Sequence, residues 1–274
     1  GGNNGVVTGG VTLGVGELND GKAIFNGTDG LLTLGTTAEA IRFYGQQNTF
    51  YLEDTGGWTI CCFIKPAAIT EQYILDLGGD EVGLKINSDG KLEGFYYTDA
   101  SPAVKVSCTS NAALTVDTLY FVAYVNRGYE QYIYTQEYDS SNKPTGAFLE
   151  NNPLYTYGDT VDTNGSPGVV VGAKKGGSLF YNGTIERLEI HNQYMYLWEL
   201  KKKALNKVLP SDLSKGPYSK YISNCKLWLP LNDNPRIATA GGAKDVTASN
   251  HTSTANNLTV SSQDRDAPGW FDDQ

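Results

Sequence analysis

The sequence predicts an all-β protein whose antiparallel strands form a two-sheet sandwich, with one amphipathic helix near residues 195–208. Short apolar runs recur at regular spacing along most of the chain, and turn-forming residues separate them. The composition agrees, because 32 Gly and 18 Tyr against one Met and two His suit many short strands joined by tight turns. A hydrophobic content of 40% is sufficient for a core.

The clearest strand pair flanks a hairpin turn at Asn87-Ser88-Asp89-Gly90. Residues 82–86 and 92–97 lie on either side of this turn, and its Asp-Gly pair supplies the positive φ angles that tight hairpin turns require. An Asn26-Gly27 turn separates two strands within residues 22–34, and a wide loop is expected at residues 139–167. The other strand candidates lie at residues 58–65, 73–77, 104–108, 119–125, 130–135, 169–172, 184–190, 225–231 and 257–260.

Residues 195–208 follow a helical pattern instead. The run Lys201–Lys203 is expected to face solvent, and Pro210 ends the helix. The opposite, apolar face should pack on the sandwich, because its residues recur mostly three or four positions apart. These residues are Leu197, Trp198, Leu200, Ala204, Leu205 and Val208.

The cysteines are expected to be buried free thiols rather than a disulfide framework. Cys61 and Cys62 are neighbours in a strand, so their side chains should point to opposite faces, and at most one of them could reach Cys108. The disulfide state of these three residues and of Cys225 stays open at this stage. No Cys-x-x-Cys or Cys-x-x-His spacing occurs, and two His residues are a thin supply for a zinc site.

The charge of the chain excludes one large class of partner. A net charge of −9 and a pI of about 4.7 argue against nucleic acid, whose binding proteins normally present a basic face. No apolar stretch is long enough for a membrane span, so no membrane insertion is expected. The sequence has no initiator Met and no signal-peptide pattern, so we expect it to start inside a longer product or after processing.

Three segments carry a family resemblance. Gly21–Gly30 is an early strand and turn, Trp58–Pro66 is an apolar strand ending in Lys-Pro, and Phe180–Asn192 is a strand that leads into the helix. In order and spacing they resemble laminin-G-like domains, which have the concanavalin A-like jelly-roll fold. The resemblance covers residues 20–210. It implies a sandwich at residues 21–210, followed by a C-terminal strand and tail at 211–274. Residues 1–20 are Gly-rich and weakly patterned, so we expect an N-terminal arm or an irregular edge there.

The C-terminal segment resembles the opening of the same family's domain. Lys226–Asp233, Lys244–Asn250 and Asn256–Val260 look like strands that normally precede the segment found here at residues 20–34. Three arrangements remain open. The chain is permuted and its last strand closes its own sandwich, or residues 221–274 begin a second repeat, or the last strand completes a neighbouring subunit.

The resemblance also requires a test for catalysis, because concanavalin A-like folds include glycoside hydrolases. Those enzymes carry acids on one strand in a Glu-x-Asp-x-x-Glu arrangement, and no such triplet occurs here. The nearest candidates, Glu186 and Glu189, are three residues apart, so strand alternation should place them on opposite faces. His191 and His251 are expected at the surface, and no nucleophile or phosphate-loop motif is present. We therefore expect no enzymatic activity.

Calcium and glycans are the ligands that the resemblance implies. The candidate Ca²⁺ ligands are loop oxygens, which a hard cation prefers, although no spacing among them describes a complete site. These are Asp29, Asp76, Asp80, Asp159, Asp162 and Asn164. Sugars stack on aromatic rings, and the best candidates are Tyr155 and Tyr157 in the long loop, followed by Tyr96 and Tyr97.

The sequence therefore predicts a non-enzymatic structural or adhesive surface protein. The chain resembles the laminin-G-like domains of bacteriophage capsid decorations and fibres, so the resemblance favours a virion component of one of these kinds. The alternative is a secreted carbohydrate-binding adhesin module. The expected partners are further copies of this chain, a capsid or fibre protein, and a cell-surface glycan. The expected location is extracellular or on a virion surface, to which Asn-x-Ser/Thr sequons such as those at Asn26 and Asn182 add weak support.

Overall fold

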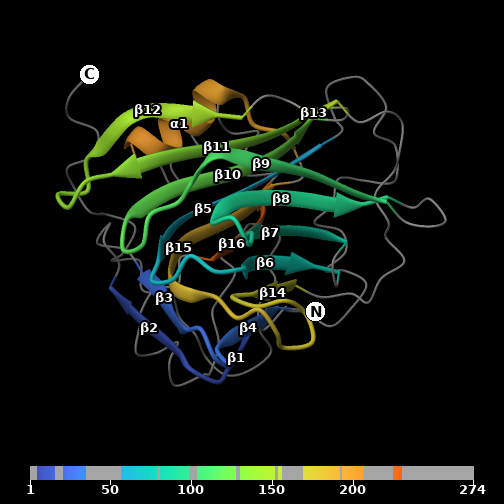
Figure 1. The fold of residues 1–274 in the computed structure, drawn as a ribbon, viewed down its shortest axis with the longest axis vertical. Coiled ribbons are helices and arrows are strands. Elements are labelled where there is room, and N and C mark those ends of the chain that lie inside the picture. The colour runs from blue at the N-terminus through green and yellow to red at the C-terminus, as the bar shows by residue number, and fades with distance from the viewer. Residues whose placement is uncertain are drawn as a thin grey trace.

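The structure, a computed structural model, is a two-layer β-sandwich with one helix on its outside (Figure 1). It describes residues 5–15, 21–34, 57–78, 81–98, 104–127, 130–151, 154–155, 169–191, 193–206 and 225–229. All strand pairs within these ranges are antiparallel. The predicted fold class, an all-β antiparallel jelly-roll sandwich with one amphipathic helix, is confirmed.

The first sheet has seven strands in the order β1-β4-β14-β6-β7-β8-β9. Its β7–β8 hairpin turns at Asn87–Gly90, where the Asn87 carboxamide oxygen accepts hydrogen bonds from the backbone N–H groups of Asp89 and Lys91. The bounds are β1 Gly5–Thr8, β4 Leu31–Leu34, β6 Gln72–Leu77, β7 Val82–Ile86, β8 Lys91–Tyr97, β9 Lys105–Ala113 and β14 Val169–Val171.

The second sheet has nine strands. Seven follow the order β12-β11-β10-β5-β15-β3-β2, while β13 pairs with β11 and β16 pairs with β15. The bounds are β2 Val11–Val15, β3 Gly21–Asn26, β5 Trp58–Pro66, β10 Leu119–Arg127, β11 Glu130–Tyr138, β12 Pro144–Glu150, β13 Leu154–Tyr155, β15 Asn182–His191 and β16 Cys225–Leu229.

The main core lies between the two sheets. Alternation along β5 sends Ile60, Cys62 and Ile64 inward, where they are fully buried. Trp58 packs edge-on against Tyr96 of the first sheet at 5.8 Å between ring centroids, and against Tyr124 of the second at 6.2 Å. The apolar faces of the two sheets therefore bury each other, which is what the period-two patterns predict.

A second core covers the outer face of the nine-stranded sheet. Cys61 and Phe63 point to this face, and Leu200 and Ala204 of α1 (Leu197–Asn206) complete the cluster. The predicted opposite orientation of Cys61 and Cys62 is confirmed. Cys61, Cys62 and Cys108 are all buried free thiols, as predicted, whereas the side chain of Cys225 lies outside the described part of the chain.

Helix α1 lies within the predicted range, but its faces differ from the prediction. Trp198 and Leu205 are 52% and 51% exposed, whereas Lys203, which we expected in solvent, is 4% exposed and faces the sheet. The spacing of apolar residues located the helix correctly. It misassigned its buried face, because Lys203 has an ion-pair partner on β15 that the helix sequence does not reveal.

The ends of the described chain both take part in the sandwich. β1 and β2, in the segment predicted to be a Gly-rich arm, form edge strands of the two sheets. β12 and β13 fall within the predicted wide loop and extend the second sheet. β16 pairs with β15 of the same chain. The strand candidate at residues 257–260 lies outside the described residues.

No helix in the described ranges has the length and apolar character that a membrane crossing requires.

Candidate functional site

A β-bulge in β15 determines which charged residues meet beneath α1. Glu186 lies opposite Phe63 and Glu189 opposite Cys61, so three steps on β15 correspond to two on β5. The extra residue falls at Arg187, whose φ angle of 50° is unusual for a residue other than Gly. The bulge places Glu186 and Glu189 on the same face of the strand, so the prediction of opposite faces is wrong.

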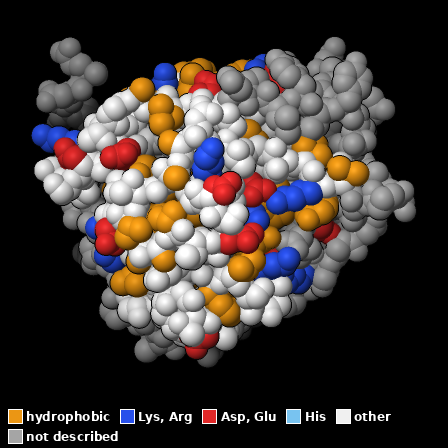
Figure 2. Space-filling view, viewed as in Figure 1, with side chains coloured by type: hydrophobic (Ala, Val, Ile, Leu, Met, Phe, Trp, Pro, Cys, Tyr) orange, Lys and Arg blue, Asp and Glu red, His pale blue; other side chains and the backbone are white. Residues whose placement is uncertain are grey.

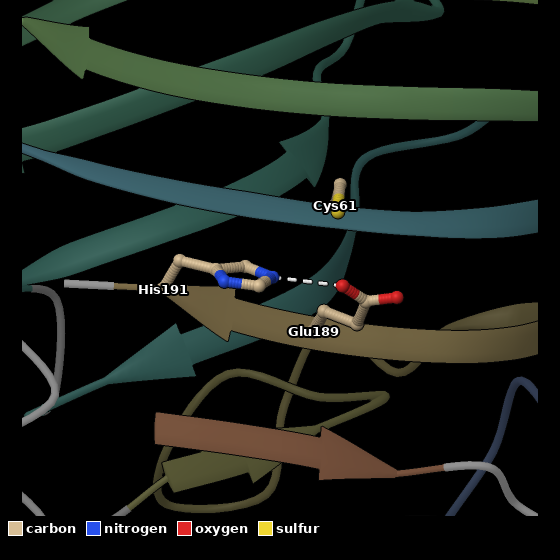
Figure 3. A group of neighbouring side chains, drawn as sticks. All are labelled: Cys61, Glu189 and His191. Carbon is tan, nitrogen blue, oxygen red and sulfur yellow. Dashed lines mark hydrogen bonds and ion pairs between the residues drawn. The ribbon is translucent and has the colours of Figure 1, made fainter. Parts of the chain in front are cut away.

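Glu189 is the centre of a buried polar cluster on this face. Its Oε2 atom accepts hydrogen bonds from Lys203 Nζ at 2.6 Å and from His191 Nε2 at 2.7 Å. Cys61 lies directly opposite Glu189 on β5, and Figure 3 shows the three side chains of Cys61, Glu189 and His191 pointing toward one another. His191 is 1% exposed, which corrects the expectation that it lies at the surface.

Burial and pairing set the protonation states in this cluster. Burial acts to raise the pKa of Glu189, but the charge of Lys203 and the hydrogen bond from His191 outweigh it, so the pKa lies below its usual value. Burial lowers the pKa of His191 and raises that of Cys61 well above its usual value. At neutral pH, Glu189 is therefore a carboxylate, His191 a neutral imidazole and Cys61 a thiol.

The candidate residues Tyr96 and Tyr97 lie on opposite faces of β8. Tyr96 is 2% exposed and packs on Trp58 in the core, so its ring is not accessible for stacking on a sugar. Tyr97 is half-buried on the outer face of the seven-stranded sheet, beside Phe95 at 6.1 Å between ring centroids.

Figure 2 shows this outer face, with acidic and basic side chains close together near the centre and apolar side chains between them. Lys105 Nζ is 2.5 Å from Glu93 Oε1, and Lys85 Nζ is 2.5 Å from Glu71 Oε1 and 3.6 Å from Glu93 Oε2. These two lysines and two glutamates thus neutralise one another.

A different aromatic surface lies on the nine-stranded sheet, at the β10–β11 connection. We call Arg127, Glu130, Tyr132, Tyr194 and Tyr196 the Arg127 surface. The Arg127 guanidinium lies over the rings of Tyr194 and Tyr196, 5.1 and 5.4 Å from their centroids. The Tyr196 ring is perpendicular to that of Tyr194, and their hydroxyl oxygens are 2.9 Å apart. That hydrogen bond, with burial, raises the pKa of Tyr194 to about 12, so this hydroxyl stays protonated.

Strands β10 and β11 position three residues of the Arg127 surface. Arg127 ends β10 and Glu130 begins β11, with Arg127 Nη1 3.8 Å from Glu130 Oε2. Tyr132, two residues further along β11, donates a hydrogen bond from its hydroxyl to Glu130 Oε2.

The segment carrying Tyr194 and Tyr196 is fixed to β5 through Thr59. The Thr59 hydroxyl donates to the Gln193 carbonyl and accepts from the Met195 N–H.

The remaining predicted residues fall around this surface or outside the described chain. Tyr155, one of the two best sequence candidates, lies in strand β13 rather than in a loop, and its backbone pairs with that of Glu130 in the Arg127 surface. Tyr157 lies outside the described residues. Sequence reasoning missed Tyr194 and Tyr196 because they precede a helix and belong to no strand pattern. The Tyr-x-Tyr spacing between a strand and a helix was the available signal.

The two calcium candidates within the described residues, Asp29 and Asp76, accept hydrogen bonds from backbone N–H groups. Asp29 Oδ1 accepts hydrogen bonds from the Gly10 N–H and the Asn26 side chain, and Asp76 Oδ2 accepts one from the Lys175 N–H. Asp80, Asp159, Asp162 and Asn164 lie outside the described residues. The calcium site stays a prediction.

Comparisons with known proteins identify the fold rather than a family. No protein-family model matches the chain, and no curated protein matches it. The enzymatically active domain of tailspike protein 2 from bacteriophage CBA120 superposes with a TM-score of 0.53 and 11% identity, covering 85% of this chain and 34% of that chain.

Two further solved structures are similar. Full-length tailspike protein 2 from an Escherichia coli O157:H7 bacteriophage gives a TM-score of 0.50 and 10% identity, with 85% of this chain and 30% of that chain covered. Domain 4 of an extracellular arabinanase from Geobacillus stearothermophilus, in complex with arabinotriose, gives 0.47 and 12%, with 73% and 87% covered. The chain thus spans about a third of the tailspike's length, and the tailspike likeness shows a shared jelly-roll β-sandwich fold.

Proposed function

We propose that this protein binds a glycan through the Arg127 surface, as a non-enzymatic surface protein of the laminin-G-like kind. The observation that carries the proposal is the Tyr196 ring, which is 36% exposed and is backed by the Arg127 guanidinium and by Tyr194. An aromatic ring held in one orientation stacks on the apolar face of a sugar. Arg127 and Glu130, at its rim, supply a donor and an acceptor for sugar hydroxyls.

The proposal of a non-enzymatic role rests on the acids beneath α1. The bulge brings Glu186 and Glu189 to one face, but these side chains are 0% and 3% exposed. Glu189 also forms an ion pair with Lys203. A glycosidase needs two carboxyl groups that reach the scissile bond from a sugar-facing surface. A saccharide cannot reach these two without displacement of the helix.

For the biological context, we propose a virion component, either a capsid decoration or a fibre protein that assembles with further copies of itself or with a capsid protein. The tailspike-like fold supports this context. The alternative context is a secreted carbohydrate-binding adhesin module, which would use the same surface.

A glycan array tests the binding site. We expect at least one glycan to be retained by the protein, and its signal to fall at least tenfold in Tyr196→Ala and in Arg127→Met. Tyr97→Ala, on the other sheet, is the matched control and should bind as the unaltered protein does. Tyr155→Ala shows whether β13 belongs to the site. A blank array, or equal binding by Tyr196→Ala, contradicts the proposal.

Two measurements test the role and the context. Incubation with the retained glycan, followed by mass spectrometry of the sugar, should recover it unchanged, whereas hydrolysis would disprove the non-enzymatic role. Quantitative mass spectrometry of purified particles should find the protein in a fixed, symmetric copy number. Its absence from particles and presence in the medium would favour the adhesin.

A further inference from the structure

The cluster beneath α1 combines three kinds of metal ligand. The thiol of Cys61, the carboxylate of Glu189 and the imidazole of His191 have ligand atoms that all lie within 4.8 Å of one another. We propose that these three side chains form a zinc-binding site. This site is separate from the Arg127 surface, so it does not depend on the proposed glycan binding.

The backbone places the three ligands before any metal binds. Cys61 and Glu189 are register partners across β5 and β15, and His191 follows Glu189 by two residues on the same face. Zinc–ligand bonds of about 2.0–2.3 Å put tetrahedral ligand atoms roughly 3.3–3.6 Å apart. Side-chain rotations that move the ligand atoms by about an ångström would therefore form the site.

The ligand set selects for zinc among common biological cations. Sulfur, imidazole nitrogen and carboxylate oxygen together are the donors that Zn²⁺ takes in proteins, whereas Ca²⁺ and Mg²⁺ take oxygen. For the Nε2 atom of His191 to bind the metal, the hydrogen that it donates to Glu189 must move to Nδ1, which leaves the imidazole neutral. The Cys61 thiol loses its proton when the S–Zn bond forms, and this proton leaves to solvent, so binding one Zn²⁺ releases one H⁺.

Lys203 is the competitor for this site. Its ammonium group lies 2.6 Å from Glu189 Oε2, so the metal-free protein already holds a cation against the carboxylate. Lys203 lies in the last turn of α1 and reaches the cluster from the helix. Zinc binding requires its ammonium group to leave Glu189, because both cations need the same carboxylate. Removal of the lysine charge should therefore strengthen metal binding while it weakens the metal-free fold.

Cobalt provides a direct probe of the thiolate. We expect the purified full chain to bind one equivalent of Zn²⁺, and to bind Co²⁺ with a thiolate-to-cobalt charge-transfer absorption that Zn²⁺ abolishes. Cys61→Ser should lose this absorption. Cys62→Ser is the matched control, because Cys62 is the next residue but faces the opposite core, and it should keep the absorption.

Lys203→Met provides the second test. Its Co²⁺ affinity should rise at least tenfold, whereas without metal its unfolding temperature should fall. If Cys61→Ser does not fold, His191→Gln replaces it, and the same loss of absorption is expected. The proposal is overturned if neither the unaltered protein nor Lys203→Met binds a stoichiometric metal, or if the absorption survives in the Cys61 variant. The cluster would then be an ion-paired anchor for α1 alone.

Discussion

At the scale of single residues, Asn26 shows how one side chain fixes a turn. Its carboxamide oxygen accepts hydrogen bonds from the backbone N–H groups of Thr28, Asp29 and Gly30, and its Nδ2 group donates to Asp29 Oδ1. The Asn-Gly pair was predicted from sequence as a turn, and Gly27 takes the positive φ of 74° that this prediction requires. The side-chain hydrogen bonds to Gly30 and Asp29 could not be predicted, because they depend on the closed geometry of the turn.

Replacing this side chain tests its contribution. Asn26→Ala leaves three backbone N–H groups without their acceptor, so the free energy of unfolding should fall by about 1–3 kcal/mol. Urea denaturation measures the change. Thr28→Ala is the matched control, since its hydroxyl makes only a 3.4 Å contact with the Asn26 carbonyl, and it should change stability by less than about 0.5 kcal/mol.

Asp29 gives the same turn a pH dependence. Hydrogen bonds from the Asn26 side chain and the Gly10 N–H lower the pKa of Asp29 below its usual 3.8. A lowered pKa means that the contribution to stability is present above pH 3.8 and is lost as the pH falls through the folded-state value. An NMR titration of the carboxyl carbon should therefore give a midpoint below 3.8, and a midpoint at or above that value would contradict these hydrogen bonds.

At the scale of elements, the sequence predicted which segments form strands better than how they align. Period-two patterns located β5, β7, β8, β10 and β15 because each buries at least one face. The bulge at Arg187 was missed, since no glycine marks it, and it reversed the expected relation of Glu186 and Glu189. β12 was missed because most of it is exposed and it lacks a buried face.

The attachment of α1 to the sheet can be tested at one hydrogen bond. The Tyr138 hydroxyl, on β11, donates to the Ala204 carbonyl near the end of the helix. Tyr138→Phe keeps the ring that packs on Phe63 and removes the hydroxyl that makes this bond, so stability should fall by about 0.5–1.5 kcal/mol. Hydrogen exchange should become faster in α1 and stay unchanged in β7 and β8. Equal acceleration throughout would show that the bond does not act locally.

At the scale of the whole molecule, the described cysteine thiols lie in two separate cores. Cys62 and Cys108 lie in the core between the sheets, and Cys61 lies in the core beneath α1. Burial raises the pKa of all three, so the reactive thiolate form is scarce. The sequence predicted the buried thiols and the opposed faces. It could not predict the polar cluster around Cys61, which joins residues from β5, β15 and α1.

A thiol reagent should distinguish the two cores. In the folded protein we expect Cys61, Cys62 and Cys108 to resist iodoacetamide, and we expect all of them to react in denaturant. In mild denaturant Cys61 should react first, because its core is covered by α1 and the short segment before it rather than by a second sheet. Peptide mass spectrometry measures the order, and earlier modification of Cys62 would show that the sheets separate before α1 is released.

β15 has an edge whose partners come from both ends of the described chain. β3 pairs with Asn182–Glu186 and β16 with Leu188–His191, so together they run along this edge, interrupted at the bulge. A polypeptide truncated after residue 206 would lack β16, so Leu188–His191 of β15 would have no partner strand on this edge. A synthetic peptide of residues 221–233 should bind to this edge of the truncated protein and restore the full-length unfolding temperature. The protein could then be reassembled from two fragments, and a label or tether attached to the peptide would be carried into the fold.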